Sequence, residues 1–311
     1  MGAYRAALAA LLVMAGCGGN PFVEPTGTVV PTDPETGEPT ATAAANGVLV
    51  NNEVKGNMNS VAYATTAAGP IRVNINAQDS AVLEGSYARN RALDVGKYKA
   101  YSHQESGSNR LVVALVSQEL DSARALVAVD GGQFTNYHGG GLYSRAEAFV
   151  KPAGGAQQKF NYSGTYAGLV NFGTATPGGP GGDLNPTQSY RTRGRVLITA
   201  DFDEMAISGG IDRRRIVDTG DALATQMLYD GAIDETGNFT GKTQRLDVDE
   251  TTGTGTFTDS GTYGGIFAGP NASEIAAVFV FKPIKEEERA EERGVFTSDN
   301  CVIASGPACR P

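Results

Sequence analysis

The chain has 311 residues, 41% of them hydrophobic, which is enough for one large or two ordinary domains with real cores. Its 41 glycines and the absence of tryptophan favour many short strands and turns over long helices. The 25 basic and 34 acidic side chains leave a net charge of −9, and no basic run approaches the size of a nucleic-acid footprint. Charge therefore argues against nucleic-acid partners and against electrostatic binding to anionic lipid.

Residues 1–16 are predicted to be a lipoprotein signal peptide. Arg5 precedes an apolar run at 6–15, which is too short to span a bilayer, since a spanning helix needs about 20 apolar residues. The run ends in Val-Met-Ala-Gly-Cys, which resembles a bacterial lipobox with methionine in place of the usual leucine. The resemblance implies lipid attachment at Cys17, and Gly18 resembles the outer-membrane sorting class. Ordinary secretion with an incidental cysteine is the alternative.

Residues 17–46 are predicted to be a lipid-anchored flexible tether. The segment is rich in glycine, threonine, alanine and glutamate and carries prolines at positions 21, 25, 31, 34 and 39. Such a composition cannot bury enough apolar surface to fold. As a coil the segment would span about 30 Å.

Residues 47–157 are predicted to form a β-rich domain. The segment 71–76 alternates apolar and polar residues, the period of a half-buried strand. The apolar runs Leu111–Val116 and Ala125–Val129 predict a hairpin, although periodicity alone also fits a helix over 111–129. Glycines predict a turn at 130–132 and a flexible loop at 137–141.

Residues 158–283 are predicted to form an eight-stranded antiparallel β-barrel. In Phe160–Phe172 every even position is aromatic, glycine or valine, and every odd position except Ala167 and Leu169 is polar, which predicts one long strand. A closing hairpin is predicted over Gly261–Phe281, GTYGGIFAGPNASEIAAVFVF. About eight strands fit in this region, a number whose inward side chains fill a barrel or leave room for one small ligand. The other strands are expected at 195–202, 206–211, 226–233 and 238–246.

Residues 284–311 are predicted to be a charged tail. The run 285–293 mixes lysine, arginine and glutamate, which favours a solvated helical turn or flexible segment. Cys301 and Cys309 follow, with a Gly-Pro turn signal between them, and an exported protein can keep disulfides. We expect a Cys301–Cys309 disulfide loop, with free thiols as the alternative.

The closing hairpin resembles the last two strands of the barrel domain of transferrin-binding-protein-B-like surface lipoproteins. The Gly-x-Phe-x-Gly-Pro core of that pattern is present at 265–270 and is followed by Glu274. The sequence departs from the pattern after Glu274, where Ile-Ala-Ala replaces an apolar residue and two glycines. The resemblance covers 158–283 and, more weakly, 47–157, which corresponds to the family's "handle". It implies an all-β fold, with a β-rich handle domain followed by an eight-stranded antiparallel β-barrel.

Motifs for catalysis or metal binding are not found. The two histidines, His103 and His138, lie 35 positions apart, and surface or loop positions account for them. The carboxylates at 201–204 suit a hairpin turn better than acid–base chemistry. The sequence at 247–258 lacks the glycine and terminal glutamate of a calcium loop. Arg213–Arg215 is the one local basic cluster, with anion binding as the alternative to ordinary strand-end charge. We therefore expect no enzyme activity, no cofactor and no metal.

The resemblance implies a non-catalytic outer-membrane lipoprotein, lipid-anchored at the cell surface, that binds a protein or solute ligand. The best-known members capture a host iron-carrier protein for an outer-membrane receptor and carry two handle–barrel lobes, whereas this chain has room for one. The ligand surface is expected on the loops Gly131–Tyr143 and Thr176–Pro186. The alternative is a periplasm-facing structural envelope lipoprotein without a soluble ligand.

Overall fold

The computed structural model describes most of the chain after residue 40. The described residues are 41–43, 45–63, 69–75, 85–104, 111–117, 122–131, 138–152, 158–172, 188–249, 251–282 and 291–301. Residues 1–16, Cys17, most of the predicted tether and Cys309 lie outside these ranges, as does the loop Thr176–Pro186. Within these ranges no helix is long and apolar enough to cross a bilayer.

The first half of the chain forms a seven-stranded antiparallel sheet, which we call the handle sheet. Its strands follow one another in sequence order. They are β3 (Met58–Ala62), β4 (Ile71–Ile75), β5 (Gly85–Arg89), β6 (Lys99–Gln104), β7 (Leu111–Ser117), β8 (Ala123–Asp130) and β9 (Gly139–Arg145). The strand expected at 71–76 and the hairpin expected at 111–129 are confirmed, so the helical alternative for 111–129 is wrong.

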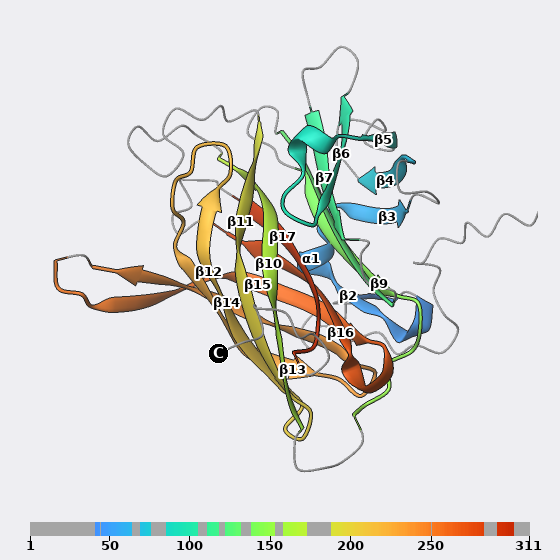
Figure 1. The fold of residues 1–311 in the computed structure, drawn as a ribbon, viewed down its shortest axis with the longest axis vertical. Helices are drawn as coiled ribbons and strands as arrows, with labels where there is room; N and C mark the ends of the chain where they lie inside the picture. Colours follow the sequence, from blue (N-terminus) through green and yellow to red (C-terminus); the bar gives the residue numbers. More distant parts are fainter. Residues whose placement is uncertain are drawn as a thin grey trace, which may run out of the picture.

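The second half closes into an eight-stranded antiparallel barrel (Figure 1). Its strands are β10 (Lys159–Asn171), β11 (Ser189–Asp201), β12 (Ala206–Ile216), β13 (Thr225–Ile233), β14 (Asn238–Val248), β15 (Gly255–Ala268), β16 (Glu274–Phe281) and β17 (Glu291–Asp299). A one-turn 3-10 helix, η4 (Pro270–Ala272), joins β15 to β16. Strand β17 pairs with both β16 and β10 and so closes the barrel. The predicted all-β fold class is confirmed.

The predicted end of the barrel at residue 283 is wrong. Seven strands lie before that residue, and the eighth is β17, within the segment expected to be a charged tail at 284–311. The charged residues obscured it because they occupy both faces of the strand. Glu292 and Arg293 are both buried, the first inside the barrel and the second against the handle.

The predicted end of the flexible tether at residue 46 is also corrected. Strand β1 (Ala41–Ala43) already pairs with β2 (Leu49–Asn51), with the 3-10 helix η1 (Ala45–Gly47) between them. Asn46 takes a left-handed φ of 60° and its amide Nδ2 donates to the carbonyl oxygens of Arg145 and Ala146, at 3.0 and 2.9 Å. This contact fixes the turn to the end of β9. A short helix, α1 (Asn52–Lys55), then leads into the handle sheet, and a second 3-10 helix, η3 (Arg91–Leu93), links β5 to β6.

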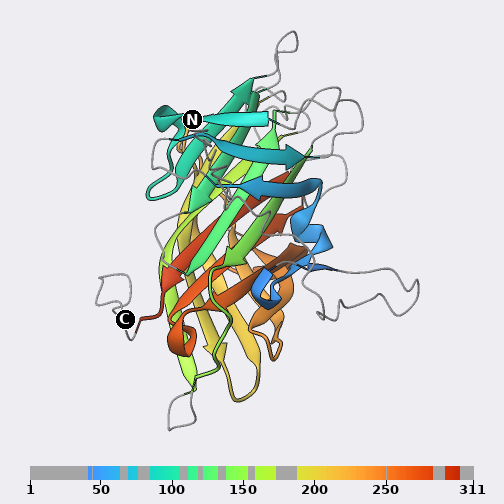
Figure 2. The ribbon, with the colours of Figure 1, turned by 90° about the vertical axis from the view of Figure 1, so that its right-hand side faces the viewer.

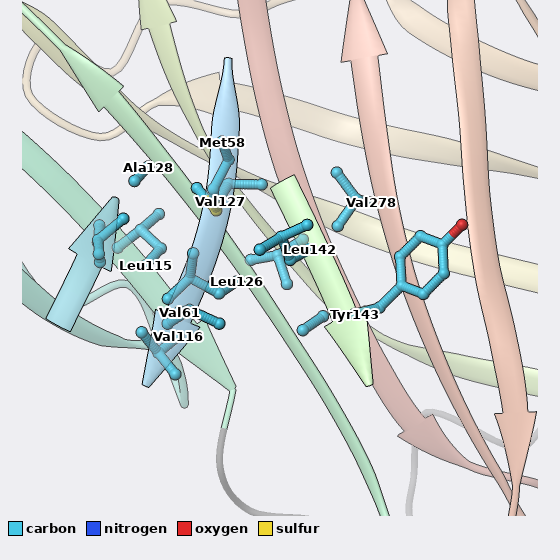
Figure 3. Packing of buried hydrophobic residues seen from close by; sticks show 14 of the residues in the cluster. Met58, Val61, Leu115, Val116, Leu126, Val127, Ala128, Leu142, Tyr143 and Val278 are labelled. Carbon is cyan, nitrogen blue, oxygen red and sulfur yellow. The ribbon is translucent and has the colours of Figure 1, made fainter. Parts of the chain in front are cut away.

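The handle sheet and the barrel share one hydrophobic core. Side chains of β7–β9 pack against the outward-facing residues of β10, β15, β16 and β17. Figure 2 shows the green strands of the handle sheet lying across the orange and red strands of the barrel. Close up, Tyr143 of β9 points to the side of the strand on which Val278 of β16 lies, while Leu142 points to the other side, next to Leu126 of β8 (Figure 3).

This shared core explains the two apolar exceptions in the alternation of β10. Ala167 and Leu169 face outward, where solvent was expected, but both are fully buried in the core shared with the handle. The second half of β10 is therefore buried on both faces, whereas its first half alternates between exposed and buried residues. Sheet faces that pack on one another in this way form a layer of core side chains between them.

Candidate functional site: the handle–barrel junction

The barrel interior is filled, so it offers no ligand cavity among the described residues. Aromatic rings from β10, β14, β15 and β16 and from the turn after β11 contact one another there. The ring centroid of Phe267 lies 5.4, 4.9 and 5.0 Å from those of Tyr162, Phe202 and Phe239. Lumen-facing glycines make room for these rings. A Cβ added to Gly294 would lie 2.0 Å from Tyr166 Oη, and one added to Gly265 would lie 2.3 Å from Phe239 Cζ. Glycines inside strands thus permit close approach of bulky side chains, as the closing hairpin predicts.

The opposite end of the lumen holds a buried polar cluster that sequence reasoning missed. Glu292 of β17 forms an ion pair with Arg214 of β12 and accepts hydrogen bonds from Tyr166 Oη at 2.8 Å and Thr192 Oγ1 at 2.5 Å. The Arg214 guanidinium lies 4.8 Å from the Phe281 ring centroid. The alternation of inward residues at 292, 294, 296 and 298 is the signal that could have found it. This cluster occupies the lumen and faces no solvent, so we assign it to the scaffold.

The three arginines at 213–215 do not form an anion site. Arg214 points into the lumen, while Arg215 donates to the carbonyl of Gly220 at 3.2 Å on the exposed side. Arg213 has a left-handed φ of 50° next to them. Because Arg214 is buried in the lumen while Arg213 and Arg215 are exposed, the three side chains do not share one surface.

The remaining candidates for chemistry have structural roles. Asp201 accepts hydrogen bonds from the backbone N–H groups of Asp203 and Glu204, at 3.1 and 3.2 Å, and so builds the β11–β12 turn. The hydrogen bond from Lys159 lowers the pKa of Asp201 most strongly. The ring of His103 lies 5.4 Å from the ring of Tyr87. No group of three or more potential metal ligands occurs in the described part of the chain.

Of the cysteines, only Cys301 lies within the described residues. Its N–H donates to the carbonyl oxygen of Asn161 at 2.7 Å, which holds it beside the start of β10. Cys17 and Cys309 lie outside the described residues. Lipidation at Cys17 and the Cys301–Cys309 disulfide therefore stay predictions.

The structure brings together the bases of the two loops that were expected to bind a ligand. Asp130 ends β8, and its carbonyl oxygen accepts hydrogen bonds from Asn171 Nδ2 at 2.7 Å and Ser189 Oγ at 2.8 Å. Asn171 ends β10 and Ser189 begins β11. The segment that leaves β8 and the segment that joins β10 to β11 therefore start from one point, which we call the handle–barrel junction.

Side chains at this junction are buried and ordered around Asp130. The N–H of Asp130 donates to the carbonyl of His138 at 2.9 Å, and the N–H of His138 donates to Asp130 Oδ1 at 3.0 Å, so this pair closes the base of the handle loop. Burial raises the pKa of the nearby Tyr87 above its ordinary value, and the negative charge of Asp130 adds to this rise. A carboxylate in such a place requires hydrogen-bond partners.

Two buried polar atoms of the junction lack partners. Within the described part of the chain, neither His138 Nε2 nor Asn171 Oδ1 makes a hydrogen bond, although both atoms are shielded from solvent. Buried polar groups are nearly always paired, so an unpaired one in a folded protein points to a function or to a missing partner. The two atoms flank the two loops, which makes the junction the best candidate for a binding surface.

The predicted handle loop Gly131–Tyr143 is shorter than expected. Residues 139–143 belong to β9 and are buried, so this part of the expectation is wrong. The glycines of this segment allow close packing and do not form a flexible loop. A Cβ on Gly140 would lie 2.0 Å from the carbonyl oxygen of Lys55, and one on Gly141 would lie 2.3 Å from Val278 Cγ1.

A second surface feature lies on the barrel away from the handle. The exposed apolar side chains Leu197 and Met227 lie on the outer faces of β11 and β13, which we call the outer wall, and two more, Val248 and Phe257, lie near the paired ends of β14 and β15. A groove of about 880 Å³ runs over β11–β13, where Gly210 pairs with Leu197 on one side and Met227 on the other. The glycine forms the floor of the groove between the two larger side chains.

These features define an all-β protein in which a sheet packs on a filled antiparallel barrel and the strand ends Asp130, Asn171 and Ser189 meet where the two join. Residues 155–300 match the family of C-lobe and N-lobe β-barrels of transferrin-binding protein B. The barrel therefore has the transferrin-binding-protein-B-like fold that the closing hairpin predicts. The match extends through β17, in agreement with the corrected end of the barrel. No curated protein sequence matches the chain.

Several solved structures of transferrin-binding protein B are similar to the chain. A double mutant from Haemophilus parasuis Hp5 has 16% identity and a TM-score of 0.41, and it covers 82% of this chain. Intact Ap-TbpB, with N and C lobes, has 20% identity and a TM-score of 0.39 over 70% of this chain. The isotype 1 protein from serogroup B Neisseria meningitidis has 14% identity and a TM-score of 0.36 over 84%. The chain spans 43%, 40% and 58% of the lengths of these three proteins.

Proposed function

We propose that this protein is a non-catalytic surface lipoprotein, anchored through Cys17, whose handle–barrel junction presents two loops to a protein ligand. The observation that carries the proposal is the double hydrogen bond from Asn171 and Ser189 to the carbonyl of Asp130. It ties one loop of the handle and one loop of the barrel to the same point. Binding residues are commonly placed on loops that a rigid scaffold positions.

The scaffold around the junction is rigid because handle and barrel share a core. Besides the apolar packing, Asn238 Nδ2 donates to the carbonyl of Gly47 at 2.9 Å, and Glu274 accepts the N–H groups of Ser122 and Ala123 at 3.0 and 2.7 Å. These bonds span 151 to 191 positions of sequence. A scaffold that does not rearrange on binding avoids one cost of association, which favours affinity.

A protein ligand fits this structure better than a small solute does. The lumen is filled by aromatic rings and by the Arg214–Glu292 cluster, so a solute finds no enclosed site among the described residues. A surface of two loops suits a protein, whose contacts spread over about 800 Å² a side. The matched family is named for transferrin binding, which supports an iron-carrier protein as one candidate. An outer-membrane receptor as a further partner is part of the proposal.

The location is tested by protease shaving of intact cells that produce the native protein. We expect the folded region to be cut from whole cells, and a Cys17→Ala variant to be released from the membrane fraction. If the native protein resists protease until the outer membrane is broken, the surface proposal fails. The periplasm-facing structural lipoprotein then takes its place.

The junction is tested by replacing residues 173–187 with a short Gly-Ser linker. We expect purified wild-type protein to capture a ligand protein from host fluid, and the loop variant to lose at least ten-fold in affinity for that same protein. Leu197→Ser, an exposed change on the outer wall, is the matched control and should bind as wild type does. Equal binding by all three proteins would place the ligand surface elsewhere.

A further inference from the structure

The ends of β14 and β15 form a hairpin that projects from the barrel (Figure 1, orange, left). Strand β13 pairs with β14 only as far as Leu246, and β16 pairs with β15 only from Gly261 onward. Residues 255–259 therefore pair with β14 alone among the described strands. None of the described strands pairs with the other edge of these residues.

A β-bulge turns this hairpin out of the barrel. The register of β14 and β15 shifts between Thr243 and Gln244, so Ser260 is the extra residue. Its Oγ lies inside the barrel, 3.0 Å from Thr243 Oγ1 and 2.5 Å from Gln226 Oε1. Gly261 follows with a φ of 153°, and a Cβ there would lie 1.9 Å from the carbonyl oxygen of Val280. Bulges of this kind bend a strand and re-aim its end.

The projecting edge lacks the usual protection against pairing. Native edge strands carry lysine, proline or inward charges that discourage a second chain. Residues 255–259 read Gly-Thr-Phe-Thr-Asp, with neither lysine nor proline. Phe257 is 55% exposed and Val248 is 56% exposed, so the hairpin also displays an apolar face.

We propose that this hairpin is a contact between two copies of the chain, in which residues 255–259 of β15 pair antiparallel with the same residues of a second copy. A two-fold axis at Phe257 places the two phenylalanines opposite each other. It also places Thr256 opposite Thr258, and Gly255 opposite Asp259. Aromatic pairs and threonine pairs across strands are favourable. An interface of this symmetry closes after two copies.

This register keeps the acidic groups of the two hairpins away from each other. The one carboxylate of the segment, Asp259, faces a glycine, and it already accepts hydrogen bonds from Tyr229 Oη at 2.8 Å and Gln244 Nε2 at 3.1 Å. The other nearby acidic groups lie toward the hairpin tip, where Asp247 pairs with Arg245 and Asp249 accepts the N–H of Thr251 at 2.8 Å. Antiparallel pairing points the two tips in opposite directions, so these acidic groups do not meet.

The test is sedimentation equilibrium of the full chain carrying Cys17→Ala, so that lipid does not drive association. Five residues a side is less than the 20–30 residues of a standard interface, so we expect a dimer that forms reversibly at micromolar or higher concentration. Phe257→Lys places two like charges opposite each other and should weaken association at least ten-fold. Val150→Lys, which changes another exposed apolar residue outside the hairpin, should leave it unchanged.

A cross-linking variant keeps the test independent of charge. Phe257→Cys should give a disulfide-linked dimer under mild oxidation, because directly opposite residues of antiparallel strands place their Cβ atoms about 4.5–5.5 Å apart. Val150→Cys is the matched control and should stay monomeric on a non-reducing gel. A wild-type protein that remains monomeric at every concentration overturns the proposal, as does a dimer that Phe257→Lys does not weaken. Circular dichroism of each variant confirms the folded state.

Discussion

Glu292 is a charged residue inside the barrel that has three side-chain partners. It is buried, accepts hydrogen bonds from Tyr166 and Thr192, and is paired with Arg214. Arg214 in turn donates to the carbonyl of Ala224 at 2.5 Å. Burial, reinforced by the charge of Glu292, raises the pKa of Tyr166 well above its ordinary value, so its hydroxyl stays a donor to the carboxylate.

Removing one member of this pair should destabilise the protein strongly. Arg214→Ala leaves the Glu292 carboxylate buried without its cation, and we expect the free energy of unfolding to fall by about 3–5 kcal/mol. The double variant Arg214→Met with Glu292→Leu removes both charges and should regain most of that loss, since an apolar pair of similar volume often replaces a buried ion pair without penalty. Urea denaturation followed by circular dichroism measures both.

The control is an ion pair between β11 and β12 on the exposed side of the barrel. Arg195 and Asp212 lie 2.6 Å apart, with side chains 51% and 39% exposed. Solvent screens such a pair, so Arg195→Ala should change the free energy of unfolding far less than Arg214→Ala does. A loss for Arg214→Ala no larger than for Arg195→Ala would show that the buried cluster does not stabilise the barrel.

At the scale of elements, β17 shows what sequence periodicity detects and what it misses. Strand β10 was predicted because its inward residues are aromatic or glycine and most of its outward ones are polar. Strand β17 has charge on both faces at its start, and each charge is buried by a different partner: Glu292 by Arg214, and Arg293 by the carbonyl oxygens of α1 residues, with Val54 at 3.1 Å. Those partners are far away in sequence, so no local pattern reveals them.

The candidate site was predictable only in its parts. Glycines pointed to loops after β8 and β10, but the contact between Asp130 and Asn171 joins residues 41 positions apart. It exists because the handle sheet packs on the barrel wall, which depends on the whole shared core. The glycines of β9 predicted a loop because the atoms that leave no room for a side chain there belong to α1 and β16, which are distant in sequence.

The corrected end of the barrel leads to a prediction about strand β17. A chain that stops after residue 283 lacks β17, which leaves β10 and β16 with open edges and Arg214 without Glu292. We expect it to lose cooperative thermal unfolding and to be degraded rapidly by protease. A chain that stops after Cys301 keeps all eight strands and should unfold cooperatively. Equal melting curves for the two chains would contradict the role of β17.

At the scale of the whole molecule, buried tyrosines in both the handle and the barrel make the free energy of unfolding depend on pH. Burial raises the pKa of Tyr63 from 10.0 to about 12. It raises the pKa values of five further tyrosines above 10.0 as well, at Tyr87 and Tyr143 in the handle and at Tyr162, Tyr166 and Tyr263 in the barrel. In the folded protein these phenols stay protonated in alkali, whereas in the unfolded chain they ionise near pH 10.

Alkaline unfolding should therefore be steep and should involve both halves together. Below pH 10 folded and unfolded states bind the same phenolic protons, so the tyrosines leave stability unchanged. Above pH 10 the unfolded state binds fewer phenolic protons than the folded state. Each tyrosine then lowers the free energy of unfolding by about 1.4 kcal/mol per pH unit, until the pH reaches the pKa of that tyrosine in the folded protein. Six such groups would cancel a typical free energy of unfolding of about 5–15 kcal/mol within about one to two pH units. Tyrosinate absorbance and circular dichroism, recorded together against pH, should change in one step because the shared core couples handle to barrel. Two separate steps would mean that the halves unfold independently, and ionisation of all twelve tyrosines near pH 10 without loss of structure would mean that these six are not buried.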